Sequence, residues 1–492
     1  MENVNSHSYW LSDINRKYDQ LVKDETVDIC IIGGGISGIT TAYYLAKEGK
    51  DVTVLEKDLI ASKTSGNTTG KITSAHNVFY EYLEQSNGED YAQRYYEANE
   101  EAIHEIQNII NEEKIDCDLV VQDNYIYATN KMEAEKLKKE ANKVNTFGRD
   151  EFVEQTKCPI KINGAIKRKN QAMFNPVKYI HGLCEKIIQN NGRIYENSKV
   201  IKVKQNNDRY DVITDKAIIH ADKIVMATNY PIVNFPGMYF TKMYQTTSYA
   251  VLAQSKNIKI DGMYISSHEP YLSFRKVDDD KILIVGCDHK TGKQEENDNY
   301  KILESIIKGI YKDAKIIDKW QTEDTITLDK LPYIGEFSKL WKNAYVITGL
   351  KKWGMTTSNV AANIIKDKIT NNDNKYSDLF TATRMEPIKN KQEVKNMLTD
   401  TGSMLVIDKF KKINETIDDI KIGEGKIVNV DGARKAVYRE KKDVFYILSP
   451  YCAHLGCDLV WNKTAKTWDC PCHGSRYDYK GKVIYAPSVK DI

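Results

Sequence analysis

The chain has 492 residues and a formal net charge of +2, from 71 Lys and Arg against 69 Asp and Glu. This near balance shows no basic excess, so nucleic acid is not expected as a partner. The length exceeds that of a usual single core and predicts two or more domains. The sequence shows neither a long apolar run nor a signal-peptide pattern at its start, so we expect a cytoplasmic protein without a transmembrane segment.

The first motif in chain order is a glycine-rich turn between two stretches of regular structure. An apolar run over residues 27–32 predicts a strand, and residues 39–46 predict a helix. The turn between them, Gly-Gly-Gly-Ile-Ser-Gly, fits the pattern G-x-G-x-x-G. A second predicted strand, residues 51–55, leads into Glu56. This order of strand, glycine turn, helix, strand and acidic residue is the fingerprint of a dinucleotide-binding fold of the Rossmann type.

Each residue of the fingerprint has a physical task. Gly33 permits the tight turn, Gly35 lets the backbone approach a pyrophosphate, and Gly38 allows close packing of the helix. The helix N-terminus, which includes Ser37, offers amide donors to the phosphates. Glu56 can accept a hydrogen bond from the adenosine ribose. FAD and NAD share this fingerprint, so the motif alone leaves the choice between them open.

Later segments bear on that choice. The loop over residues 62–71 is rich in hydroxyl and glycine residues, a strand ends in Ala-Thr-Asn at 227–229, and segments 327–335 and 346–357 follow. With the fingerprint, they make residues 27–370 resemble the D-amino-acid oxidase-like flavoproteins. The resemblance implies noncovalently bound FAD in an α/β Rossmann-type domain with a β-rich substrate subdomain. It adds further FAD-binding residues to those of the fingerprint: Lys57, Thr69, Val200, Thr228, Gly349, Gly354 and Met355.

The C-terminal part combines short strands with two ligand boxes. Residues 422–448 alternate apolar and polar positions between Gly and Asp turns, which predicts antiparallel β structure. Two boxes follow, Cys452-Ala-His454 and Cys470-Pro-Cys-His473. Two thiolates and two imidazoles are the ligand set of a Rieske [2Fe-2S] cluster. A zinc site or a cysteine-rich scaffold is the alternative, but zinc knuckles tend to use C-x2-C pairs.

Residues 413–492 closely resemble the Rieske family. In that family Ser475 and Tyr477 match a serine and a tyrosine that donate hydrogen bonds to cluster sulfurs. Because such bonds stabilise the reduced state, we expect a midpoint potential in the upper half of the roughly −150 to +300 mV Rieske range. The resemblance implies Cys452 and Cys470 as ligands of one iron, His454 and His473 as ligands of the other, and a disulfide between Cys457 and Cys472.

The two resemblances divide the chain into four parts. These are an N-terminal extension (1–26), an FAD-dependent oxidoreductase domain (27–385), a helical connector (386–412) and a small all-β Rieske domain (413–492). Both domains together look like a bacterial family in which a D-amino-acid oxidase-like flavoprotein is fused to a Rieske domain.

The combination of cofactors predicts a dehydrogenase. We expect it to oxidise a small amine, amino acid or N-methyl compound at FAD and to pass electrons through the [2Fe-2S] cluster to an external acceptor. One alternative is a non-enzymatic electron carrier or redox sensor. Another is a reductase fed by NAD(P)H, although no second dinucleotide fingerprint follows the first.

No motif marks the catalytic residues. Tyr249 and Arg275 fall in strand-like sequence on the expected substrate side, and Lys352 lies in the loop expected over the flavin. Arg275 or Lys352 would suit a substrate carboxylate. A structural or surface role is the more frequent one for such residues, so the three stay candidates.

Overall fold

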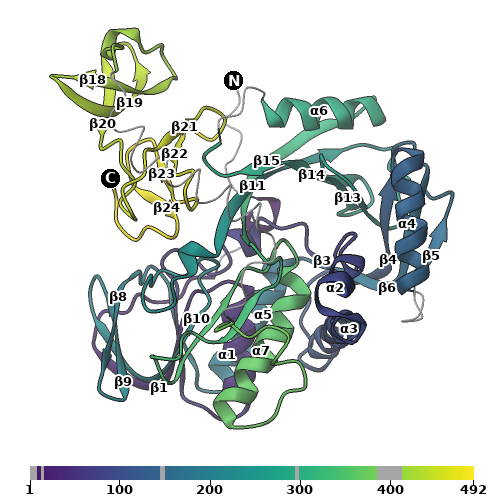
Figure 1. The fold of residues 1–492 in the computed structure, drawn as a ribbon, viewed down its shortest axis with the longest axis horizontal. Helices are drawn as coiled ribbons and strands as arrows, with labels where there is room; N and C mark the ends of the chain where they lie inside the picture. The colour runs from purple at the N-terminus through teal and green to yellow at the C-terminus, as the bar shows by residue number, and fades with distance from the viewer. Residues whose placement is uncertain (1–7, 13–15, 145–149, 294–297, 385–412) are drawn as a thin grey trace.

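The structure, a computed structural model, describes residues 8–12, 16–144, 150–293, 298–384 and 413–492. The described chain forms two large sheets with flanking helices, followed by two small sheets at the C-terminal end (Figure 1). This confirms the predicted fold class. The predicted connector over 386–412 lies outside the described residues, and the domain boundaries stay predictions.

The first large sheet has eight strands and a parallel centre. Its order is β16-β17-β10-β1-β2-β7, with β9 beside β10 and β8 beside β9. The pairs that join β17, β10, β1, β2 and β7 are parallel, whereas β16, β9 and β8 pair antiparallel. Its strands are β1 (Glu25–Ile32), β2 (Val52–Leu55), β7 (Arg193–Tyr195), β8 (Val200–Asn206), β9 (Arg209–Thr214), β10 (Ile218–Met226), β16 (Tyr333–Glu336) and β17 (Ala344–Thr348).

Helices α1 (Ile36–Lys47), α5 (Pro176–Gln189) and α7 (Gly354–Thr370) pack together beside this sheet (Figure 1). Helix α7 also contacts α3 (Glu89–Glu112), which follows the short α2 (Tyr80–Asn87). The N-terminus of α5 shows why these residues form a helix there. The Asn175 side chain accepts hydrogen bonds from the first free backbone amides, and proline follows it at the first helical position.

The second large sheet has nine strands in the order β15-β11-β14-β13-β12-β4-β6-β3, with β5 beside β6. Helix α4 (Lys131–Val144) packs on β4, β5 and β6, and α6 (Asn299–Ile310) packs on β11 and β14. The strands are β3 (Lys71–Ile72), β4 (Val120–Ala128), β5 (Asp150–Val153), β6 (Gly164–Met173), β11 (Met243–Gln254), β12 (Met263–Ser266), β13 (Leu272–Lys276), β14 (Lys281–Lys290) and β15 (Lys315–Thr327).

The C-terminal domain is all-β, as predicted, and its strands form two small antiparallel sheets. Strands β18 (Gly425–Val430), β19 (Ala433–Lys441) and β20 (Val444–Leu448) form the first sheet. Strands β21 (Val460–Asn462), β22 (Thr467–Asp469), β23 (Arg476–Asp478) and β24 (Val483–Tyr485) form the second, which lies beside β11 and β15 in Figure 1.

Among the helices of the described chain, none is long and apolar enough to cross a membrane.

Candidate active site and cluster site

The glycine turn after β1 leaves no room for side chains. Gly33 has φ 116°, and a Cβ there would lie 2.5 Å from the carbonyl oxygen of Ala227. A Cβ on Gly38 would lie 2.0 Å from the carbonyl oxygen of Gly33. Gly35 caps the N-terminus of α1, and the next amide, that of Ile36, donates to Ser65 Oγ at 2.9 Å. The turn therefore has the tight geometry that lets backbone amides face a phosphate.

Glu56 is held at the end of β2, beside this turn. Its Oε2 accepts a hydrogen bond from the Gly34 amide at 2.7 Å, and its Oε1 accepts one from the Asp58 amide at 2.9 Å. Burial raises the pKa of Glu56, and these backbone hydrogen bonds oppose the shift. The carboxylate is thus fixed where the fingerprint expects a partner for ribose hydroxyls.

A cavity lies against the glycine turn, and we call it the turn cavity. Of the other predicted FAD-binding residues, Gly38 packs behind the turn, Thr69 lines a neighbouring cavity, and Gly349 stands between Thr348 and Leu350, which line the turn cavity. The predicted residues that line it are Gly33, Gly35, Ser37, Glu56, Lys57, Val200, Thr228, Gly354 and Met355.

The neighbouring cavity, which we call the sheet cavity, lies over the second large sheet and adjoins the turn cavity. Strands β11 and β15 contribute polar side chains to it, among them Ser248 and Thr322. Five residues line both cavities: Thr64, Thr68, Asp324, Lys351 and Lys352. The two cavities therefore adjoin, and one molecule can reach these five residues from either side.

Charged groups of both signs line the sheet cavity. Lys352 Nζ lies 2.8 Å from the carboxylate of Asp288. Burial raises the pKa of Asp324 to about 6, while the charge of Lys352 opposes that shift and the charge of Asp288 adds to it. Asp324 is therefore a carboxylate at neutral pH that takes up a proton in mildly acidic solution.

Lys71 is a buried cation of the same cavity. Its Nζ donates to the carbonyl oxygen of Tyr264 at 2.8 Å and to Ser273 Oγ at 2.6 Å. Burial, with a smaller contribution from the charge of Arg275, lowers the pKa of Lys71 to about 7. The ammonium form of Lys71 is therefore lost as the pH rises through neutrality.

The structure separates the three catalytic candidates. Arg275 is buried, donates to the carbonyl oxygen of Gly70 at 3.0 Å, and lies 4.9 Å from the ring of Trp10. Tyr249 is also buried, and its hydroxyl lies 3.1 Å from Nε2 of His289. Neither is among the described residues that line the two cavities, which favours the structural alternative for both. Lys352 lines both cavities and stays a candidate.

Sequence reasoning missed Asp324, Asp288 and Lys71 as residues of the site. One feature of the sequence could have pointed to Lys71: it ends a loop of small hydroxyl and glycine residues, just before an apolar position. Asp324 and Asp288 lie in long strands without any motif, so their position over the cavity depends on strand register.

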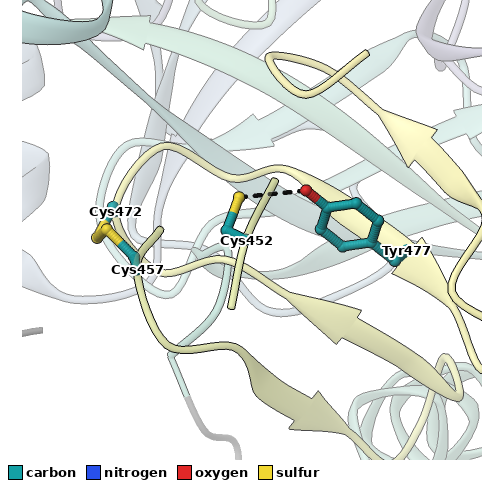
Figure 2. Close-up of a disulfide and its surroundings, with 4 residues drawn as sticks. All are labelled: Cys452, Cys457, Cys472 and Tyr477. Atoms are coloured by element: carbon teal, nitrogen blue, oxygen red, sulfur yellow. Dashed lines mark hydrogen bonds between the residues drawn. A yellow bond between two sulfur atoms is a disulfide. The ribbon is translucent and has the colours of Figure 1, made fainter. Parts of the chain in front are cut away.

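The cysteines of the two C-terminal boxes meet in a buried cluster. Hydrogen bonding to Cys470 lowers the pKa of the Cys452 thiol to about 6, burial opposes the shift, and hydrogen bonds from Tyr477 and Ser475 add to it. Tyr477 Oη lies 3.2 Å from Cys452 Sγ (Figure 2). Two adjacent thiols with hydroxyl donors beside them fit the thiolate half of an iron-sulfur site.

The predicted disulfide between Cys457 and Cys472 is present (Figure 2). Their sulfur atoms and that of Cys470 lie within 4.8 Å of one another. Because two of the three are bonded to each other, only Cys470 keeps a thiol for a metal. The disulfide therefore joins the two ligand loops without taking a ligand position.

The rings of the box histidines, His454 and His473, lie edge to face with their centroids 5.1 Å apart. His454 Nε2 lies 2.8 Å from Oδ1 of Asn234, and an amide oxygen only accepts, so this nitrogen carries the proton. Nδ1 of His454 and Nδ1 of His473 are buried and have no hydrogen-bond partner in the described part of the chain. Burial lowers the pKa of His454 to about 4 and that of His473 to about 3. Two neutral imidazoles with unpartnered Nδ1 atoms fit the second half of the ligand set.

Comparison with known proteins decides the assignment of both halves. Residues 28–368 match the family model described as FAD dependent oxidoreductase, and residues 413–492 match that of the Rieske [2Fe-2S] domain. The chain belongs to the FAD dependent oxidoreductase family. The putative Rieske 2Fe-2S iron-sulfur protein YhfW of Bacillus subtilis (strain 168) is 34% identical over 492 residues, 99% of this chain and 96% of that protein.

Other members of the FAD dependent oxidoreductase family match the flavin domain more distantly. The gamma-glutamylputrescine oxidoreductase of Escherichia coli (strain K12) is 23% identical over 378 residues, 73% of this chain and 88% of that protein. Glycine oxidase from Geobacillus kaustophilus superposes with a TM-score of 0.63 at 16% identity, over 74% of this chain and 100% of that one. L-proline dehydrogenase from P. horikoshii gives a TM-score of 0.63 at 18% identity, over 74% and 98%. These structures show the fold.

This FAD-dependent oxidoreductase thus uses FAD and a [2Fe-2S] cluster, and its own residues fit both. The glycine turn and Glu56 would hold the FAD, and the sheet cavity beside it would admit a substrate. The two thiols and the two unpartnered Nδ1 atoms would hold the cluster. When bound, these groups supply two-electron oxidation of an organic molecule and one-electron transfer, respectively.

Proposed function

We propose that this FAD-dependent oxidoreductase oxidises a small amine, amino acid or N-methyl compound in the sheet cavity and delivers the electrons through its Rieske domain to an external acceptor. The observation that carries the proposal is the common boundary of the two cavities. Asp324 and Lys352 line both, so one substrate can contact them and the FAD at once.

The charges of the sheet cavity support a substrate with an ammonium group. Asp324 is the carboxylate at the boundary with the turn cavity, and with its pKa at about 6 it is charged at neutral pH. It would hold a substrate ammonium near the FAD. Lys71 would complement a substrate carboxylate, because a protonated amine has a third donor beyond the two that Tyr264 and Ser273 already use.

The names of related proteins point the same way. Gamma-glutamylputrescine oxidoreductase and glycine oxidase are named for compounds with an amino group. They match 73% and 74% of this chain, respectively. They support a nitrogen-containing substrate without specifying which one.

The position of the Rieske domain supports electron delivery through it. Strands β11 and β15 place alternate side chains on opposite faces, as strands do. Thr246 and Thr322 face the sheet cavity, whereas Gln321 and Glu323 face the Rieske domain and accept hydrogen bonds from Arg476. The Rieske domain therefore lies against the back of the sheet that lines the proposed substrate site.

Anaerobic reduction tests the proposal. The purified protein with both cofactors is mixed with a panel of amines, amino acids, N-methyl amino acids, NADH and NADPH, while flavin absorbance and the low-temperature EPR signal are recorded. We expect at least one amine-type compound to bleach the flavin and to produce the signal of a reduced Rieske cluster.

Other outcomes separate the alternatives. Bleaching by NADH or NADPH alone would identify a reductase. Reduction only by dithionite would identify an electron carrier or sensor. With an active amine, Asp324→Asn should raise the KM at pH 8 by at least tenfold, whereas an unchanged KM removes Asp324 from the substrate site.

A further inference from the structure

The turn cavity is walled by both domains of the chain. The glycine turn and Lys57 line it from the flavin domain. Facing residues come from the end of the Rieske domain, in and just after β24: Val483, Ile484, Tyr485, Ala486, Ser488 and Val489. We call residues 483–489 the covering segment. It follows the ligand boxes in the sequence, so FAD-binding motifs of the flavin domain give no hint of it.

Flavin-domain side chains anchor the covering segment at two points. Lys57 Nζ donates to the carbonyl oxygen of Ile484. Gln245 Nε2 donates to the carbonyl oxygen of Ala486 at 2.7 Å. Both anchoring side chains also line the turn cavity. The segment is thus fixed over the cavity by residues that would themselves contact the FAD.

Tyr485 lies between these anchors and faces the flavin domain. Lys63 Nζ lies 5.5 Å from the centre of its ring, and Lys63 also lines the turn cavity. Burial raises the pKa of Tyr485 to about 12, so its hydroxyl stays protonated at neutral pH. An aromatic ring with a hydroxyl donor suits contact with the sugar, ring or phosphate groups of a dinucleotide.

The covering segment also contacts the cluster loops. The Ser488 amide donates to Ser475 Oγ at 3.0 Å, and Ser475 lies two residues after His473. Tyr485 pairs with Arg476 in the β23–β24 ladder, and Arg476 forms a buried ion pair with Glu323 of the flavin domain. One short segment therefore joins the turn cavity, the cluster loops and the domain interface.

We propose that the covering segment, centred on Tyr485, is part of the FAD site, so that the Rieske domain forms one wall of the flavin pocket. FAD binding and docking of the Rieske domain then stabilise each other, because binding free energies are coupled reciprocally. The FAD affinity of the flavin domain depends on a residue some 450 positions after the glycine turn.

Affinity for FAD tests this inference directly. Full-length protein with its cluster is freed of FAD and titrated with FAD by fluorescence, at equal iron content for each variant. We expect Tyr485→Ala to weaken FAD binding at least tenfold and Tyr485→Phe to restore most of it. The matched control is Tyr479→Ala, since the Tyr479 ring packs inside the Rieske domain on Tyr438 and Tyr446. Loss of affinity in both alanine variants, or in neither, overturns the proposal.

A second measurement needs no variant. Amide hydrogen exchange of the wild-type protein is compared with and without FAD, with the cluster in place. We expect FAD to slow exchange in peptides that cover residues 33–37 and also in those that cover 483–489. Protection of the glycine turn without any change over 483–489 overturns the proposal.

Discussion

His454 of the Rieske domain donates a hydrogen bond from Nε2 to Oδ1 of Asn234 in the flavin domain, at 2.8 Å. The ring of Phe240, also from the flavin domain, meets the imidazoles of His454 and His473 edge-on, with centroids 6.1 and 5.8 Å away. The histidine side of the cluster site thus faces the flavin domain, which shortens the path between the two cofactor sites.

Asn234 should tune the cluster through this bond. An acceptor on the distal nitrogen makes a ligand imidazole more basic and favours the oxidised cluster. Asn234→Leu should therefore raise the midpoint potential, and Asn234→Asp should lower it. A hydrogen bond of about 1 kcal/mol corresponds to about 40 mV for one electron. An EPR-monitored redox titration measures the shift, and equal potentials in all three proteins would contradict the role.

Tyr477 should act in the opposite direction. Its hydroxyl contacts the sulfur of Cys452, and a donor to a ligand sulfur favours the reduced state. Tyr477→Phe should lower the midpoint potential by about 40 mV, again taking about 1 kcal/mol for the bond. The control is Tyr479→Phe, whose ring packs on Tyr438. A potential as high in Tyr477→Phe as in the wild type would count against this assignment.

Gly38→Ala should abolish FAD binding. Its Cβ would lie 2.0 Å from the carbonyl oxygen of Gly33, and the helix would have to move away from the turn. The matched control is Gly309→Ala in α6, where a Cβ would meet no atom within 4 Å. There alanine should keep FAD and raise helix stability by about 0.5–1 kcal/mol. The flavin-to-protein absorbance ratio and the melting temperature report both effects.

Asp324 should make kcat/KM fall on the acidic side of the pH profile. Because burial raises its pKa to about 6, the carboxylate that would hold a substrate ammonium is lost as the pH falls through 6. We expect kcat/KM for an amine substrate to fall about tenfold per pH unit below that point in the wild type. This fall should be absent in Asp324→Asn. An identical fall in the variant would assign it to another group.

The same pKa shift predicts a stability effect that needs no substrate. The folded protein holds the Asp324 proton up to about pH 6, whereas the unfolded chain releases it near 3.8. The stabilising effect of that proton is complete below pH 3.8 and is lost as the pH rises through 6. The melting temperature of the wild type should therefore fall relative to that of Asp324→Asn between pH 4 and pH 6. A constant difference over this range would show that the pKa is not raised.

Local signals explain what the sequence could predict. Gly33 is required by its positive φ of 116° and Gly38 by its close approach to the carbonyl oxygen of Gly33. Both requirements arise within one turn, so their pattern is visible in the sequence. The same holds for the box around His454, since its ligands are two residues apart in one loop. Strands β18, β19 and β20 are likewise marked by alternation and by glycine turns.

Contacts across the fold explain the rest. Whether Tyr249 or Ser248 faces the sheet cavity is set by the register of β11, and a shift by one residue exchanges them. The sequence makes Arg275 a candidate for binding a substrate carboxylate. Its burial against Trp10 could not be predicted, because Trp10 is far away in the sequence. The role of the covering segment around Tyr485 could not be predicted from the sequence either, because the segment reaches the turn cavity only when the two domains dock.

Strand β11 contributes side chains to two different sites, one on each face of the sheet. Tyr244, Thr246 and Ser248 face the sheet cavity, while Gln245 touches Gly474 and holds the covering segment. Requirements for the substrate and for the Rieske domain therefore alternate residue by residue along a single strand. Side chains can be exchanged on either face independently to change specificity or docking. A one-residue insertion or deletion in β11, in contrast, would swap the two sets and damage both at once.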